Sequence, residues 1–257
     1  MPRLRVVQSL AAGVDRVLPF INDGVVLCSA HGAHTTATAE LALTLILAAS
    51  RGVPGYLGDQ AARRWEPVTS PGLADKKVIV VGHGSIGAAI ATRLRCFEAD
   101  VVPVARTARS GVSAMADLPK LLPDADVVVL AVPLNDETRG LVDSTFLSHL
   151  LRDTLLVNVS RGGVVVTDDL VEALYDHRLS AALDVTDPEP LPSDHPLWGA
   201  PNLILTPHVG AKSDAQSPRI QQFIADQVTR FARGQGLRNV VERRIPAIRR
   251  TGDAEQL

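Results

Sequence analysis

Three side chains far apart in the chain, Arg161, Glu189 and His208, are of the types needed to hold and protonate a small oxo acid. The planar, permanently charged guanidinium of Arg161 suits a carboxylate and the carbonyl oxygen beside it. If Glu189 bonds one imidazole nitrogen of His208, it fixes the tautomer and leaves the other nitrogen to donate a proton. Each residue also has an ordinary interpretation: a surface ion pair for Arg161, a solvated carboxylate for Glu189, and a structural role for His208.

All three residues follow short apolar runs that are typical of buried strands. The runs are residues 155–159 before Arg161, 181–185 before Glu189, and 203–205 before His208. Ligands of open α/β folds bind at the carboxyl edge of the sheet. The shared position therefore favours one common site over three unrelated roles.

A glycine-rich motif, Gly82-His83-Gly84-Ser85-Ile86-Gly87, runs directly from the predicted strand 77–81 into a helical segment. In such a turn the first glycine permits a tight bend and the second lets backbone N–H groups approach a pyrophosphate. The third lets helix and strand pack closely. The motif predicts a dinucleotide site with Gly82, Gly84, Ser85, Ile86 and Gly87 as its contacts.

The segment after the next predicted strand, residues 101–104, indicates which dinucleotide binds. The acid that usually bonds the ribose hydroxyls is absent there, and Ala105-Arg106-Thr107-Ala108-Arg109 follows instead. Asp100 begins the strand and so belongs to the opposite edge. Arg106, Thr107 and Arg109 would favour a 2′-phosphate, which predicts NADP(H) over NAD(H), with NAD(H) still possible. The alternative is that these arginines are solvated loop charges.

The order of the elements predicts an α/β protein with a doubly wound parallel sheet. Six β-branched runs, at 78–81, 101–104, 127–132, 155–159, 181–185 and 203–205, alternate with helical or loop segments. We assign residues 70–210 to this dinucleotide-binding domain. Residues 1–69 and 211–241, with strands at 4–8 and 24–28, helices at 36–51 and 214–233 and a further strand at 239–241, form a smaller substrate domain. Residues 242–257 read as a tail.

Composition excludes several classes of protein. The chain has 257 residues, of which 46% are hydrophobic and 21% charged, with a formal net charge of −2. This composition is that of a globular protein, and it argues against a nucleic-acid or membrane-surface partner. Cys28 and Cys96 lack metal-ligand spacing and read as buried free thiols, and no metal site is expected. With no secretion signal, the cytoplasm is the expected compartment.

Five ordered stretches resemble the D-isomer-specific 2-hydroxyacid dehydrogenase family, including its glyoxylate and hydroxypyruvate reductases. They are residues 80–87, 131–141 (Ala-Val-Pro-Leu-Asn-Asp-Glu-Thr-Arg-Gly-Leu), 157–162, 182–192 and 206–210 (Thr-Pro-His-Val-Gly). The resemblance extends from about Leu4 to Val241. It implies a Rossmann coenzyme domain and a flavodoxin-like substrate domain.

The resemblance also implies roles for individual residues. Arg161, Glu189 and His208 match the family's substrate-binding arginine, histidine-orienting glutamate and acid/base histidine. Asp184 matches the residue that bonds the nicotinamide carboxamide, and residues 9–15 match the loop whose backbone N–H groups hold the substrate carboxylate. Further implied contacts are Val132, Pro133 and Ser160 to the coenzyme, and Ala12 and Gly13 to the substrate. Residues 55–65 resemble a segment that joins homodimers.

One departure from the family concerns the start of the chain. Residues 1–5 align well inside the family's substrate domain, so its opening strands and helices are expected to be missing. Two classes of function therefore stay open. One is a hydride-transferring oxidoreductase that interconverts a small 2-oxo acid and a D-2-hydroxy acid. The other is an NAD(P)-binding regulatory protein or inactive homologue without turnover.

Overall fold

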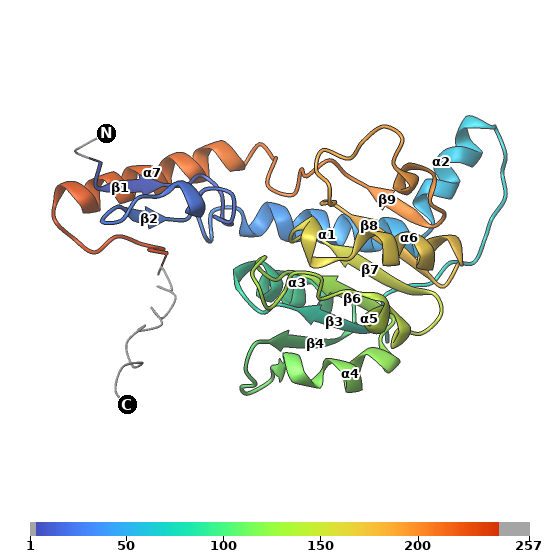
Figure 1. Cartoon of the computed structure of the whole chain (residues 1–257). Helices are drawn as coiled ribbons and strands as arrows, with labels where there is room; N and C mark the ends of the chain where they lie inside the picture. The colour runs from blue at the N-terminus through green and yellow to red at the C-terminus, as the bar shows by residue number, and fades with distance from the viewer. Residues whose placement is uncertain (1–3, 242–257) are drawn as a thin grey trace, which may run out of the picture.

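The computed structural model describes residues 4–241, which form a larger part on seven strands and a smaller part on two (Figure 1). The predicted tail, 242–257, lies outside the described residues. In Figure 1 the smaller part, with β1, β2 and α7, lies at one end of an elongated molecule. Helix α1 runs from there into the larger part.

The larger sheet is parallel throughout and has the order β5-β4-β3-β6-β7-β8-β9. The chain passes from β3 outward to β4 and β5, then returns to β6 on the other side of β3. Ligands bind at such a reversal of strand order. The predicted doubly wound sheet is confirmed. Its strands are β3 (Lys77–Val81), β4 (Asp100–Ala105), β5 (Ser113–Ala114), β6 (Val127–Leu130), β7 (Thr154–Asn158), β8 (Leu179–Leu183) and β9 (Leu203–Leu205).

Helices cover both faces of this sheet. The α-helices are α1 (Thr35–Ser50), α2 (Val53–Ala61), α3 (Ser85–Arg95), α4 (Leu118–Leu121), α5 (Ser144–Ser148), α6 (Thr167–Tyr175) and α7 (Gln216–Ala232). Short 3-10 helices lie at η1 (Leu18–Phe20), η2 (Met115–Asp117), η3 (Leu122–Asp124), η4 (Gly162–Val164) and η5 (Pro196–Gly199). Val78 and Val80 of β3 pack in the core with α1 and α3. Ile79 and Val81 pack in the other core with α4, α5 and α6. This alternation is the period of two that a strand buried on both faces requires.

Helix α1 contributes buried side chains to the core of the larger sheet, among them Ala39, Ala42 and Ile46. It packs on α3, β7 and β8. The sequence predicts that its residues belong to the smaller domain, and that division stays a prediction. The packing shows that α1 ties the two parts together, because its first turn follows β2 and its buried face lies on the larger sheet.

The smaller part consists of β1 (Val6–Gln8), parallel to β2 (Val26–Cys28), with α7 beside them (Figure 1). The buried Gln227 of α7 donates to the Gln8 side chain at 2.8 Å and to the Arg238 carbonyl at 3.1 Å. The strand predicted at 239–241 is only an isolated bridge between Val240 and Cys28. The side chain of Gln227 therefore joins the last described segment to β1.

The two cysteines differ in their surroundings. Cys28 is buried, as predicted, but Cys96 is exposed, so the prediction for Cys96 was wrong. Cys96 follows the buried Leu94 of α3 by two residues. Two residues correspond to a rotation of about 200° around a helix, which turns Cys96 away from the core.

Helix α2 has no buried residue and stands at the far end of the molecule from the smaller part (Figure 1). Within residues 4–241 no single helix is long and apolar enough to cross a membrane. Helices α1 and α2 together, with a bend of 65° between them, have the length and composition to do so.

Candidate active site

The glycine-rich turn joins β3 to α3, as its sequence predicts. Gly82 has a φ of +104°, and a Cβ there would lie 2.5 Å from the Ala131 carbonyl oxygen. A Cβ at Gly87 would collide with the carbonyl oxygen of Gly82, whereas one at Gly84 would meet no atom within 4 Å. The first and third glycines are thus required by packing. The second leaves open space at the N-terminus of α3, where an anion such as a pyrophosphate fits.

This open space belongs to a cavity of about 690 Å³ at the reversal of strand order. A volume of this size is typical of small-molecule and coenzyme sites. Its walls are residues 12–15 after β1, residues 82–86 of the glycine-rich turn, and residues from the segments after β4 (105–109), β6 (131–138) and β7 (159–161). The residues present therefore fit a dinucleotide, and the open space beside Gly84 would accept its pyrophosphate.

The segment after β4 brings two arginines to one end of the cavity. Arg106 pairs with Glu137 at 3.0 Å, and Arg109 donates to the backbone oxygen of His83 at 3.2 Å. Burial first, and then the charges of Arg109 and Arg95, lower the pKa of His83, so its ring is neutral near neutral pH. The expected acid is absent, because Ala105 ends β4 and Asp100 begins it.

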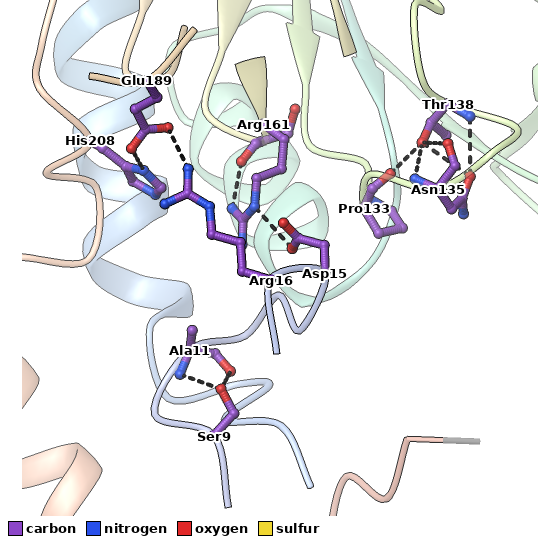
Figure 2. Close-up of polar contacts among 11 residues, drawn as sticks. Ser9, Ala11, Asp15, Arg16, Pro133, Asn135, Thr138, Arg161, Glu189 and His208 are labelled. Carbon is purple, nitrogen blue, oxygen red and sulfur yellow. Dashed lines mark hydrogen bonds and ion pairs between the residues drawn. The ribbon is translucent and has the colours of Figure 1, made fainter. Parts of the chain in front are cut away.

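The loop after β6 is held by its own side chains (Figure 2). The Asn135 carboxamide oxygen accepts from the backbone N–H groups of Glu137 at 3.0 Å and Thr138 at 3.1 Å. The Thr138 hydroxyl donates to the Pro133 carbonyl at 2.5 Å. These bonds form a rigid turn that fixes Val132, Pro133 and Glu137 on the cavity wall.

Arg161 follows β7 and reaches toward the smaller part (Figure 2). Its Nη1 donates to the Ser160 carbonyl at 2.7 Å, and its Nε donates to Asp15 at 3.3 Å. Gly13 lies so close to the guanidinium that a Cβ there would collide with Arg161. The structure therefore brings the predicted arginine against the predicted loop of Ala12 and Gly13, across the cavity between the two parts.

Glu189 and His208 form a close pair. The distance from His208 Nδ1 to Glu189 Oε1 is 2.6 Å, and Glu189 Oε2 lies 3.5 Å from Arg16 Nη2. The contact occupies Nδ1, so a proton that His208 delivers to a ligand must come from Nε2. Arg16, adjacent to Asp15, extends from the smaller part to this pair (Figure 2).

The buried Asp184 holds the backbone around His208. Its carboxylate accepts from the Thr206 hydroxyl at 2.6 Å, and from the N–H groups of Val209 and Gly210 at 2.8 Å each. His208 itself has a φ of +53°. Asp184 therefore positions the turn that carries the imidazole, and its expected bond to a nicotinamide carboxamide stays a prediction.

The family model for the D-isomer specific 2-hydroxyacid dehydrogenase NAD binding domain matches residues 43–210, more than half of the chain. The chain belongs to this family.

Relatives and solved structures of the family cover nearly all of the chain. The glyoxylate reductase of Aeropyrum pernix is 32% identical over an alignment of 270 positions, which covers 98% of this chain and 80% of that protein. The glyoxylate reductase/hydroxypyruvate reductase of Homo sapiens is 30% identical over an alignment of 246 positions, which covers 90% of this chain and 75% of that protein. The NADPH-dependent glyoxylate/hydroxypyruvate reductase of Sinorhizobium meliloti, solved with NADP and sulfate, has a TM-score of 0.84 at 31% identity. The match covers 94% of this chain and 79% of that one.

In this family member the predicted site residues fall into two groups. One group lines the cavity: the predicted coenzyme contacts on the glycine-rich turn and after β4, β6 and β7, together with Ala12, Gly13 and Arg161. Gly87 is the exception, because it packs against the backbone of Gly82. Glu189, His208 and Asp184 lie on the segments around β8 and β9. Arg16 connects the first two of these to the loop that contacts Arg161.

Sequence reasoning missed Arg16 and Glu137 and gave Asp15 no role of its own. Each forms an ion pair with a predicted site residue: Arg16 with Glu189, Glu137 with Arg106, and Asp15 with Arg161. Charged partners from distant segments leave no periodic signal in a single sequence. The only available sign was their place inside or directly after stretches that resemble the family.

Proposed function

We propose that this chain is an NADP(H)-dependent reductase of small 2-oxo acids of the glyoxylate or hydroxypyruvate type, forming D-2-hydroxy acids. The observation that carries the proposal is the 2.6 Å pair between Glu189 and His208, on the same sheet edge as Arg161 and the glycine-rich turn. A protein that only binds a nucleotide has no need for an oriented proton donor at that edge. Relatives named glyoxylate reductase support the substrate class.

Each side chain has a defined task in this reaction. The Arg161 guanidinium binds the substrate carboxylate, with the backbone N–H groups of Ala12 and Gly13 on the facing loop. His208 donates the Nε2 proton to the carbonyl oxygen as it becomes a hydroxyl, and Glu189 stabilises the imidazole at Nδ1. When bound, the coenzyme supplies the hydride that reduces the carbonyl carbon. In the reverse direction His208 accepts the proton.

The preference for NADP(H) is supported by Arg106, Thr107 and Arg109 on the cavity wall where NAD-using proteins carry an acid. Homologous structures from Sinorhizobium meliloti and Xanthobacter autotrophicus contain NADP and NADPH. We also propose the cytoplasm as the compartment. A homodimer is supported by α2 and the segment after it, where Leu57 is 61% and Trp65 95% exposed.

The test is an absorbance assay of coenzyme oxidation by the purified chain with glyoxylate, hydroxypyruvate and pyruvate, using NADPH and NADH in parallel. We expect turnover with glyoxylate or hydroxypyruvate. The kcat/KM for NADPH should be higher than the kcat/KM for NADH. Tight NADPH binding without turnover of any of the three acids would contradict the proposal and favour a nucleotide-binding regulatory protein.

A further inference from the structure

The ion pair between Arg106 and Glu137 lies beside the start of the glycine-rich turn. Arg106 follows β4 and Glu137 lies in the loop after β6, and these strands flank β3 on opposite sides. The 3.0 Å ion pair therefore spans the carboxyl end of β3, where the turn begins, and both residues line the cavity. A ligand that enters this end of the cavity meets the pair directly.

Hydrogen bonds within the loop after β6 hold the backbone at Glu137 in place. Its N–H donates to the Asn135 side chain at 3.0 Å, and the same oxygen accepts from Thr138 N–H at 3.1 Å. The Thr138 hydroxyl closes the turn by donating to Pro133 (Figure 2). The turn thus holds the Glu137 carboxylate within reach of Arg106.

The two arginines of this end are in different electrostatic states. Arg109 donates to a neutral backbone oxygen, that of His83, and so keeps its charge for a ligand. The charge of Arg106 is balanced by the carboxylate of Glu137. Of the two cations that would attract a 2′-phosphate, one is thus already neutralised by the protein.

We infer that Glu137 is an internal counter-ion of Arg106 that takes the place of the 2′-phosphate and thereby sets the preference between NADP(H) and NAD(H). The phosphate must displace the carboxylate before it gains Arg106. Displacement is feasible because the Arg106 and Glu137 side chains are 60% and 56% exposed, and exposed ion pairs are weak. Glu137 therefore lowers the preference for NADP(H) without abolishing it. This inference rests on the proposed function only in taking the cavity as the coenzyme site.

Calorimetric titration of the full chain with 2′,5′-ADP and 5′-AMP isolates this end of the site from catalysis. In Glu137→Gln we expect 2′,5′-ADP to bind roughly 2- to 5-fold more tightly than in the wild type, because this ratio corresponds to the free energy of an exposed ion pair. The affinity for 5′-AMP should stay the same. The matched control is Glu172→Gln, the same change on an exposed position of α6. It should leave both affinities unchanged.

A double-mutant cycle with Arg106→Gln tests whether Glu137 acts through Arg106. We expect the gain from Glu137→Gln to shrink when Arg106 is absent. An equal gain in both backgrounds, or no gain at all, overturns the inference. A wild type that reduces oxo acids yet binds 2′,5′-ADP no better than 5′-AMP also overturns it, and leaves the dehydrogenase function standing.

Discussion

The guanidinium of Arg161 is oriented by contacts within the chain. The Ser160 carbonyl accepts from Nη1 at 2.7 Å and Asp15 accepts from Nε at 3.3 Å, so two sides of the planar group are fixed. Asn158 stiffens the same segment, because its side chain accepts from Ser160 and donates to the Arg161 carbonyl. At the scale of single residues, these contacts support the proposal that Arg161 binds a carboxylate.

Arg161→Lys keeps the charge but loses the planar set of donors. We expect the KM for glyoxylate to rise roughly 10- to 100-fold, the value of one or two charge-assisted hydrogen bonds. The affinity for NADPH, measured by fluorescence titration, should stay the same. If steady-state kinetics give an unchanged KM, Arg161 is not the substrate anchor.

At the scale of elements, the turn between β3 and α3 contains one glycine needed for packing, Gly87, and one that leaves space for a ligand, Gly84. A side chain at Gly87 collides with the backbone of Gly82, whereas a Cβ at Gly84 meets no atom within 4 Å, and Gly84 lines the cavity. Gly84 has extended backbone angles, φ −81° and ψ −164°, that any residue adopts. Gly84 and Gly87 therefore respond to the same substitution in different ways.

We expect Gly84→Val to leave the free energy of unfolding within about 1 kcal/mol of the wild type and to weaken NADPH binding more than about 10-fold. Gly87→Val serves as the comparison and should cost about 3 kcal/mol or more by overpacking. Chemical denaturation and fluorescence titration measure the two quantities. Equal losses of stability in the two variants would show that Gly84, too, is required by packing.

The elements that sequence predicts well are those with a strong local signal. The strands β3, β6 and β7 are uninterrupted β-branched or aliphatic runs, and each lies within one or two residues of its predicted bounds. The two-residue β5 and helix α2 were missed, because β5 is too short for a pattern and α2 buries no face. Likewise, the strand ends placed Arg161, Glu189 and His208 at one edge, but the partners Arg16 and Glu137 depend on tertiary contacts.

At the scale of the whole molecule, the site is built where two parts meet. The loop after β1 sends Asp15 to Arg161 and Arg16 to Glu189, so neighbouring residues of the smaller part reach both groups of the larger part. Figure 2 shows these side chains extending from one loop. These two ion pairs therefore tie the positions of Arg161 and Glu189 to one loop of the smaller part.

The far end of the molecule carries the proposed dimer contact. We expect the wild type to sediment as a dimer, because α2 and the segment after it expose the large apolar side chains of Leu57, Trp65 and Val68. Leu57→Glu with Trp65→Glu should shift it to a monomer while circular dichroism stays unchanged. A wild type that sediments as a monomer at micromolar concentration contradicts the homodimer.

In the proposed reaction His208, oriented by Glu189, delivers the proton during reduction. The most direct measurement compares the rate of NADPH oxidation with glyoxylate in the wild type and in His208→Gln, at saturating substrate. We expect kcat to fall by roughly 10²- to 10⁴-fold in His208→Gln while the Kd for NADPH stays the same. A His208→Gln variant that retains wild-type turnover would contradict it.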